Sequence, residues 1–302
     1  MGGRTEMGEA MRRRQGTRLF GLGVVMVAVV SIGGLTGCEP GTNYISLGDS
    51  YTSGPLITDQ TGEPLGCLRS NRNWPALTNP RIRVTGFRDM SCGGAQTRHM
   101  WNTQGVDPGG PNPAQLSAVD GASKVVTLQI GGNDIGFSDI IKTCALQNPF
   151  GSGCTADYVH DGRDELSEVI AATAPKIDAV VAEIERKAPQ AHVFLVGYPT
   201  LVPQSGSGCY PLVPLLPKDV PYLRAKTVEL NAMIAARAAA AGVNFIDLYG
   251  PSAGHDFCAS ISNKWVEGII PTSVAAPVHP NAKGMENFAN LVAAAINAKV
   301  TE

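Results

Sequence analysis

The chain has 302 residues, of which 43% are hydrophobic and 17% are charged, and its formal net charge is −2 at pH 7. This length and apolar content are sufficient for one α/β domain with a full core. The 24 basic and 26 acidic residues nearly balance. That balance argues against the strongly basic surface typical of nucleic-acid-binding proteins, so we expect no nucleic-acid partner.

The N-terminal segment predicts export. Three arginines at 12–14 precede a short apolar stretch, which ends in Leu-Thr-Gly-Cys38. This pattern is typical of a secretory signal peptide, because a membrane span would need ~20 apolar residues. The last four residues resemble a bacterial lipobox, whose cysteine becomes the lipidated first residue. We expect a signal peptide over 1–37, a mature domain over 38–302 and a lipid anchor at Cys38. The alternative is an ordinary signal peptide, with Cys38 removed or left free.

Apolar periodicity along the mature chain predicts an alternating α/β fold. Short, β-branched runs that end in Gly, Asp or Pro indicate buried strands, and longer runs with helical spacing indicate helices. The expected strands are 44–47, 82–87, 125–130, 192–198 and 243–248, and the expected helices are 165–187, 222–241 and 283–298. Strands that alternate with helices form a parallel sheet. We therefore expect a single-domain, flavodoxin-like three-layer α/β/α sandwich, interrupted by Gly/Pro-rich loops.

Six cysteines remain after Cys38, an even number that fits an oxidising compartment. They lie at positions 67, 92, 144, 154, 209 and 258. Six cysteines allow fifteen pairings, and the spacing does not choose among them. None of the six has Cys-x-x-Cys spacing with histidines, so we expect no metal site.

Four short polar segments punctuate the chain, and together they suggest a family. Gly-Asp-Ser50 ends the first strand, Cys-Gly-Gly94 follows the second, Gly-Asn133-Asp follows the third, and His279-Pro-Asn precedes the last helix. In this order they resemble the four sequence blocks of the SGNH (GDSL) hydrolases, a family of serine esterases and lipases. The resemblance spans residues 44–284. It implies a carboxylic ester hydrolase that needs no cofactor.

Ester cleavage requires these residue types, independently of the family resemblance. A serine hydroxyl becomes a good nucleophile when a base accepts its proton, and histidine is the usual base. Ser50 and His279 are the candidates. An oxyanion needs prepositioned donors. The resemblance assigns this role to the N–H groups of Ser50 and Gly94 and to the side-chain amide of Asn133.

The last block lacks the aspartate that many family members carry three residues before the histidine, because Ala276 stands there. Some secreted actinobacterial members resemble this chain in using a backbone carbonyl instead. We therefore expect a Ser-His dyad, with the carbonyl of Ala276 or Pro277 orienting His279. Asp247 and Asp256 are the alternative acids that could orient the imidazole. Among the other histidines, His255 is the rival base.

Further implications come from the resemblance. Secreted actinobacterial relatives pair their cysteines sequentially, which implies Cys67–Cys92, Cys144–Cys154 and Cys209–Cys258. The expected substrate is a small ester or a lipid, and the expected protein is a monomer at the cell envelope or secreted. A carbohydrate O-acetyl esterase with the same site is one alternative. An inactive surface-binding lipoprotein of hydrolase fold is the other.

Overall fold

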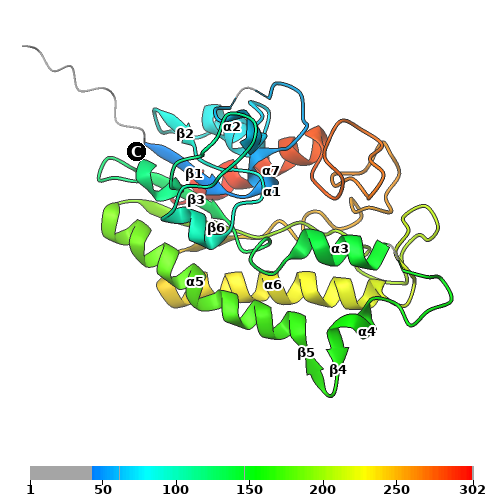
Figure 1. The fold of residues 1–302 in the computed structure, drawn as a ribbon. Helices are drawn as coiled ribbons and strands as arrows, with labels where there is room; N and C mark the ends of the chain where they lie inside the picture. The colour runs from blue at the N-terminus through cyan, green and yellow to red at the C-terminus, as the bar shows by residue number, and fades with distance from the viewer. Residues whose placement is uncertain (1–42, 61, 146, 301–302) are drawn as a thin grey trace, which may run out of the picture. The chain divides into compact units, whose positions relative to one another are not determined.

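In the computed structural model, which describes residues 43–300 except 61 and 146, a five-stranded sheet forms the centre of the fold. Its strands are β1 (Tyr44–Gly48), β2 (Phe87–Asp89), β3 (Val125–Gln129), β6 (His192–Val196) and β7 (Asn244–Ile246). All neighbours are parallel and the spatial order is β2-β1-β3-β6-β7 (Figure 1). This is a flavodoxin-like order, because the chain first moves outward from β1 to β2 and then reverses through β3.

Helices cover both faces of the sheet. The helices are α1 (Ser50–Ser53), α2 (Trp74–Thr78), α3 (Phe137–Ala145), α4 (Thr155–Tyr158), α5 (Glu165–Lys187), α6 (Val220–Ala241) and α7 (Ala282–Asn297). Helices α5 and α6 pack against each other on one face, and α2 and α7 on the other (Figure 1). A two-stranded hairpin, β4 (Val159–His160) with β5 (Arg163–Asp164), precedes α5. The expected three-layer α/β/α sandwich is confirmed.

The ends of the long helices follow local chemistry. Asp164 caps α5 by accepting hydrogen bonds from the N–H groups of Leu166 and Ser167. Acidic side chains occupy the first turn of α5 and basic ones its last turn, as the helix dipole favours. Gly242 ends α6 in the left-handed conformation, with φ 73°. These signals explain why the predicted range 165–187 matches α5.

One predicted strand is displaced along the chain. The apolar run at 82–87 predicted a strand there, but the strand β2 begins only at Phe87 and extends to Asp89. Ile82 is buried, yet it follows a 3₁₀ turn and lies outside the ladder. Its apolar character reflects packing of a loop against the core rather than strand pairing. The strands β6 and β7 are also shorter than their predicted ranges, 192–198 and 243–248.

Three disulfides link segments outside the central sheet among the described residues, and one of them starts in α3. They join Cys67 to Cys92, Cys144 to Cys154, and Cys209 to Cys258. This is the sequential pairing that the resemblance implied. Each bridge lies outside the strands of the central sheet and restrains a loop that regular structure does not hold.

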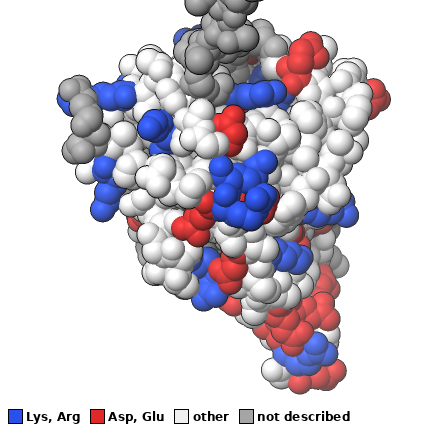
Figure 2. All heavy atoms as spheres, turned by 90° about the vertical axis from the view of Figure 1, so that its left-hand side faces the viewer, with Lys and Arg blue, Asp and Glu red and all other residues white. Residues whose placement is uncertain are grey.

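The surface carries charges of both signs. On the face seen in Figure 2, basic and acidic side chains are intermixed over the described residues. Several form ion pairs, such as Arg81 with Glu286 and Arg163 with Glu168. Within residues 43–300, apart from 61 and 146, no helix is both long and apolar enough to cross a membrane. The same residues contain no group of three or more His, Cys, Asp and Glu side chains suited to a metal ion.

Candidate functional site

The predicted site residues gather where the strand order reverses. Ser50 begins α1 directly after β1, and Asn133 lies four residues after β3. Strands β1 and β3 are parallel neighbours, so their carboxyl ends lie at one edge of the sheet. In open α/β sheets, ligands bind at this switch point. The fold therefore brings the first and third sequence blocks together.

The turn at Ser50 is tightly built. Asp49 caps α1 and accepts a hydrogen bond from the Tyr51 N–H at 2.9 Å. A Cβ on Gly48 would lie 2.2 Å from the Thr52 hydroxyl, so only glycine fits between the strand and the helix. Gln115 pairs with both the N–H and the carbonyl of Gly48, at 2.8 and 2.9 Å. These contacts fix the backbone that carries Ser50.

A buried tyrosine connects this turn to the Asn133 loop. The Tyr198 hydroxyl donates to Asp49 Oδ2 at 2.5 Å and accepts from the Gly132 N–H at 2.9 Å. Burial raises the pKa of Asp49 to about 7, although the hydrogen bonds from Tyr198 and Tyr51 act to lower it. The short O–O distance is typical of a hydroxyl that donates to a carboxylate. Sequence analysis missed Tyr198, even though it follows β6 at the same edge of the sheet.

The segment around Gly94 presents a backbone donor. Gly94 has φ 74°, a conformation that favours glycine, and it is exposed. Among the described residues, no acceptor binds the N–H of Gly94 or the N–H of Ser50. Asn133 Nδ2 donates one hydrogen to the Ala95 carbonyl at 2.9 Å, which leaves its second hydrogen free. All three predicted donors therefore have a hydrogen available for a ligand.

The His279 ring is oriented by a backbone carbonyl. Its Nδ1 lies 2.7 Å from the Pro277 carbonyl oxygen. A carbonyl only accepts, so Nδ1 carries the proton and Nε2 is the free base. Nε2 is buried and has no hydrogen-bond partner among the described residues. Burial lowers the pKa of His279, and the bond to Pro277 only partly opposes this effect. His279 is therefore neutral near pH 7 and can accept a proton.

Tyr51 brings the histidine segment to the nucleophile turn. Its ring lies 5.0 Å from the His279 ring, measured between centroids. Its hydroxyl donates to the Val278 carbonyl at 2.6 Å. Because Tyr51 directly follows Ser50, these contacts bring His279 beside the Ser50 turn.

A buried glutamate holds the loop on which His279 lies. The Glu267 carboxylate accepts from Thr272, from the Ser273 hydroxyl at 2.6 Å and from Asn281 Nδ2 at 2.7 Å. Its own N–H donates to the His279 carbonyl at 2.9 Å. Burial would raise the pKa of Glu267, but these hydrogen bonds outweigh burial and lower it. Sequence analysis missed this residue, and nothing in its local sequence distinguishes it from a surface glutamate.

The alternative residues are engaged elsewhere. The His255 ring stacks on Trp265 with a centroid distance of 4.0 Å, and its Nδ1 contacts the Asn263 carbonyl. Asp247 accepts from backbone N–H groups of the following turn, and Asp256 accepts from the Cys258 N–H at 2.8 Å. Neither aspartate is hydrogen-bonded to His279 in the described part of the chain. Cys38, the predicted lipidation site, lies outside the described residues.

An apolar cavity adjoins Ser50. Its volume is about 20 Å³, room for about one water molecule, and Ser50 and Asn133 line it. Its apolar walls are formed by Phe137, Leu201 and Leu230. This volume is far below the ~300–1,000 Å³ common for small-molecule sites. The residues that line it therefore form an apolar contact surface beside Ser50 and not a pocket that holds a whole substrate.

The chain is similar to known hydrolases along most of its length. A family model described as the GDSL-like Lipase/Acylhydrolase family matches residues 46–286. Lipase 2 of Streptomyces coelicolor is 35% identical over 260 residues, which cover 83% of this chain and 84% of that relative. A lipase of Streptomyces rimosus is 33% identical over 243 residues, which cover 80% and 82%.

Two solved structures share the fold. The phospholipase A1 from Streptomyces albidoflavus superposes with a TM-score of 0.71 at 26% identity, covering 86% of this chain and all of that one. The extracellular lipase from Streptomyces rimosus also gives a TM-score of 0.71, at 31% identity, and covers 84% and 99%. The family match contains every candidate residue from Ser50 to His279.

Proposed function

Because the chain belongs to the GDSL-like lipase/acylhydrolase family, we propose that it cleaves carboxylic esters through an acyl-enzyme on Ser50. That it is a carboxylic ester hydrolase follows from the family and from its lipase and esterase relatives. The assignment of roles to single residues rests mainly on one observation. The N–H groups of Ser50 and Gly94 have no acceptor among the described residues, and the Asn133 amide uses only one of its two hydrogens.

The first half of the reaction acylates Ser50. His279 Nε2 accepts the hydroxyl proton while Ser50 Oγ attacks the ester carbonyl carbon. The carbonyl oxygen becomes an oxyanion, and the donors on Ser50, Gly94 and Asn133 stabilise it. When the tetrahedral intermediate collapses, the C–O bond to the alcohol breaks, and His279 gives the departing oxygen its proton. The Pro277 carbonyl holds the imidazole and stabilises its charged form throughout.

The second half releases the acid. Water attacks the acyl-Ser50 carbonyl, His279 accepts the proton of this water, and the same three donors bind the second oxyanion. Collapse returns the proton from His279 to Ser50 Oγ and frees the carboxylic acid. The pKa of His279, which burial lowers, keeps the base neutral at the start of each half-reaction.

The apolar residues beside Ser50 and the named relatives support one substrate class. The cavity walls, including Phe137, Leu201 and Leu230, are apolar, so they favour an acyl chain over an acetyl group on a sugar. Named relatives include lipases and a phospholipase A1, which act on lipid esters. We therefore favour lipid esters as substrates.

Covalent labelling tests the nucleophile. A fluorophosphonate should label the wild-type protein on Ser50, as located by peptide mass spectrometry, and Ser50→Ala should abolish both labelling and hydrolysis of nitrophenyl esters. Ser53→Ala is the matched control, because Ser53 lies in the same helix and its buried hydroxyl has no partner among the described residues. Full activity in a folded Ser50→Ala protein would refute the proposal.

The cellular location is a separate proposal. We infer that Cys38 is lipidated after export and holds the hydrolase domain, residues 38–302, at the cell envelope. The lipobox-like sequence ending at Cys38 supports this inference, as does the extracellular lipase among the structural relatives. Mass spectrometry of the N-terminal peptide from native membranes tests it. Cys38→Ala should release the protein from the membrane fraction, and an unmodified N-terminus downstream of Cys38 would contradict the anchor.

A further inference from the structure

The backbone that carries Gly94 is held at nearly every polar group. The carbonyls of residues 90–93 accept from Asn112 Nδ2 at 3.5 Å, Arg69 at 2.8 Å, the Ala95 N–H at 3.0 Å and Gln104 Nε2 at 2.7 Å, respectively. The N–H groups of 90–93 and of Ala95 also have acceptors. Among the described residues, the Gly94 N–H is the one N–H of this segment that has none. Because Gly94 is exposed, its N–H is open to a ligand while the rest of the segment is fixed by hydrogen bonds.

Gln104 determines where this donor points. The Gly93–Gly94 peptide is trans, so its carbonyl and its N–H point in opposite directions within one plane. Gln104 Nε2 holds the Gly93 carbonyl at 2.7 Å on one side. The Gly94 N–H must therefore point to the other side, away from Gln104. Rotation of the peptide plane would break the bond to Gln104.

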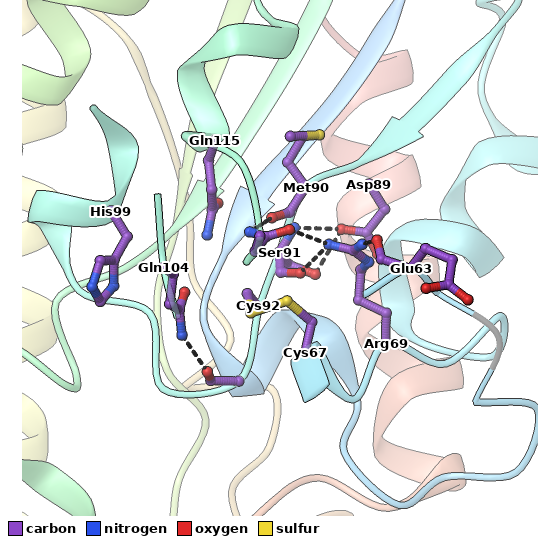
Figure 3. Close-up of a disulfide and its surroundings, with 12 residues drawn as sticks. Glu63, Cys67, Arg69, Asp89, Met90, Ser91, Cys92, His99, Gln104 and Gln115 are labelled. Atoms are coloured by element: carbon purple, nitrogen blue, oxygen red, sulfur yellow. Dashed lines mark hydrogen bonds between the residues drawn. A yellow bond between two sulfur atoms is a disulfide. The ribbon is translucent and has the colours of Figure 1, made fainter. Parts of the chain in front are cut away.

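Gln104 is itself fixed in place. Its backbone forms two hydrogen bonds with Asn112, at 2.9 and 2.8 Å, and its side chain is buried. Asn112 Oδ1 accepts from Arg69, whose guanidinium also binds the Ser91 carbonyl (Figure 3). Cys92 is bonded to Cys67, whose carbonyl accepts the Gly93 N–H at 2.9 Å. The segment before Gly94 is thus restrained by the hydrogen bond from Arg69, by the Cys67–Cys92 disulfide and by the hydrogen bond from Gln104.

The other half of the Gln104 amide has no partner. Its Oε1 is buried and forms no hydrogen bond with the described residues. The bond to the Gly93 carbonyl is therefore the one hydrogen bond that this side chain forms with the described residues.

We propose that Gln104 is a positioning residue of the oxyanion site, which holds the Gly93 carbonyl so that the Gly94 N–H points at the substrate oxygen. This inference rests on the proposed function, in which Gly94 is an oxyanion donor. Gln104 lies outside the four sequence blocks and touches neither Ser50 nor His279 through a hydrogen bond. Its effect is therefore confined to the direction of one donor.

Steady-state kinetics of Gln104→Met tests the proposal. The substitution keeps the length of the side chain and removes the donor. Complete loss of one oxyanion donor costs about 10²–10³ in rate, and a misdirected donor should cost less, so we expect kcat to fall by about 10- to 100-fold. KM should stay within about twofold, because the donor acts mainly in the transition state. Inactivation by a fluorophosphonate should slow in parallel.

Gln104→Glu provides a rescue that a merely structural role would not show. The neutral carboxylic acid can donate to the Gly93 carbonyl, whereas the carboxylate cannot. The activity of this variant relative to wild type should therefore rise as the pH falls, and the ratio cancels the titration of His279. This variant also keeps the proposal testable if Gln104→Met folds poorly. A ratio that is constant with pH would overturn the proposal.

Two controls separate the possible failures. Gln60→Met removes similar bonds, since Gln60 Nε2 donates to the carbonyls of Gly54 and Ile57 and its Oε1 also has no partner among the described residues. This variant should retain kcat within about threefold, because it directs no oxyanion donor. An equal loss in both Met variants, or a kcat unchanged in folded Gln104→Met, would reject the role of Gln104.

Ser50→Ala shows which proposal has failed when the Gln104 result is negative. If Ser50→Ala is inactive in the same assay, only the inference about Gln104 fails. If Ser50→Ala is active, the proposed function fails.

Discussion

The nucleophile and the base are held in different ways. Ser50 follows a fully buried strand, and its turn is fixed by backbone pairing within the sheet and by Gln115. His279 lies in the segment 247–281, where the structure describes every residue and contains no helix or strand. Its loop is held by backbone hydrogen bonds to residues 265–268 and by side chains, chiefly Glu267 and Tyr51. Regular structure therefore positions the nucleophile, and a local polar network positions the base.

The base loop also stores backbone strain. Val278 has φ 64°, although a β-branched residue strongly disfavours this conformation. Such strain costs about 1–3 kcal/mol and persists only where the surroundings impose it. Here the Val278 N–H donates to the Gly268 carbonyl at 3.1 Å, and its carbonyl accepts from Tyr51. The conformation of Val278 places the Pro277 carbonyl so that it orients the His279 ring.

The largest expected effect comes from the base itself. His279→Ala removes the proton acceptor of both half-reactions, so kcat should fall by at least ~10³, as in other serine hydrolases that lose a catalytic group. The melting temperature should change little, because the ring forms one hydrogen bond and lies on a loop. Nitrophenyl ester kinetics and thermal melting check both parts. Substantial activity in the folded variant would transfer the role to another base.

Glu267→Gln tests whether the base loop depends on its buried carboxylate. The amide can satisfy fewer of the donors from Thr272, Ser273 and Asn281, and an unmet buried donor costs about 1–3 kcal/mol. We expect the melting temperature to fall by several degrees and kcat by about tenfold or more. Glu286→Gln, on the exposed side of α7, should change neither.

The same carboxylate predicts a pH dependence. The hydrogen bonds to Glu267 lower its folded-state pKa below the ordinary glutamate value of 4.5. Its contribution to stability is therefore present above pH 4.5 and is lost as the pH falls through the folded-state pKa. The difference in melting temperature between wild type and Glu267→Gln should shrink over this acidic range. A difference that stays constant with pH would show that charge on Glu267 is irrelevant.

The same contrast explains how much the sequence could predict. Ser50, Gly94 and Asn133 follow strands, and the carboxyl ends of parallel strands meet at one edge of the sheet, so their proximity could be predicted. Glu267 binds His279 and Asn281, which lie 12 and 14 positions further along an irregular loop, and no periodicity reveals such contacts. The displaced strand at 82–87 has a related cause, because a buried loop residue such as Ile82 has the same apolar character as a strand residue.

Tyr198→Phe tests the link between the two strand ends. The variant loses the hydrogen bond to Asp49 and leaves the Gly132 N–H without its acceptor. We expect a fall in kcat of about 5- to 10-fold, because the turns after β1 and β3 lose the hydrogen bonds that join them. Tyr44→Phe is the matched control, since Tyr44 is also buried and its hydroxyl contacts Thr127 away from the site. Equal losses in both variants would make Tyr198 a general stabiliser of the core.

This variant should also change the acidic limb of the pH profile. The Tyr198 hydrogen bond lowers the pKa of Asp49, whereas burial and the nearby charge of Asp134 raise it. Removing the hydroxyl should therefore raise the pKa of Asp49 above its present value of about 7. Activity that depends on the ionised carboxylate will then begin to fall at a higher pH. His279 titrates on the same limb, so the shift is read against Tyr44→Phe, which leaves His279 unchanged.

The smallest expected effect concerns the two aspartates that could have replaced the missing acid. Replacing a true triad aspartate by asparagine costs about 10⁴ in kcat, because the imidazole is then held in the wrong tautomer. Here Nδ1 donates to the Pro277 carbonyl, which has no proton to lose and which no side-chain substitution removes. Asp247→Asn and Asp256→Asn should therefore each retain kcat within about threefold of wild type. Both aspartates accept hydrogen bonds from nearby N–H groups, so thermal melting must first show that the variants are folded. A folded variant as inactive as Ser50→Ala would mean that an aspartate, and not the Pro277 carbonyl, orients His279 during catalysis.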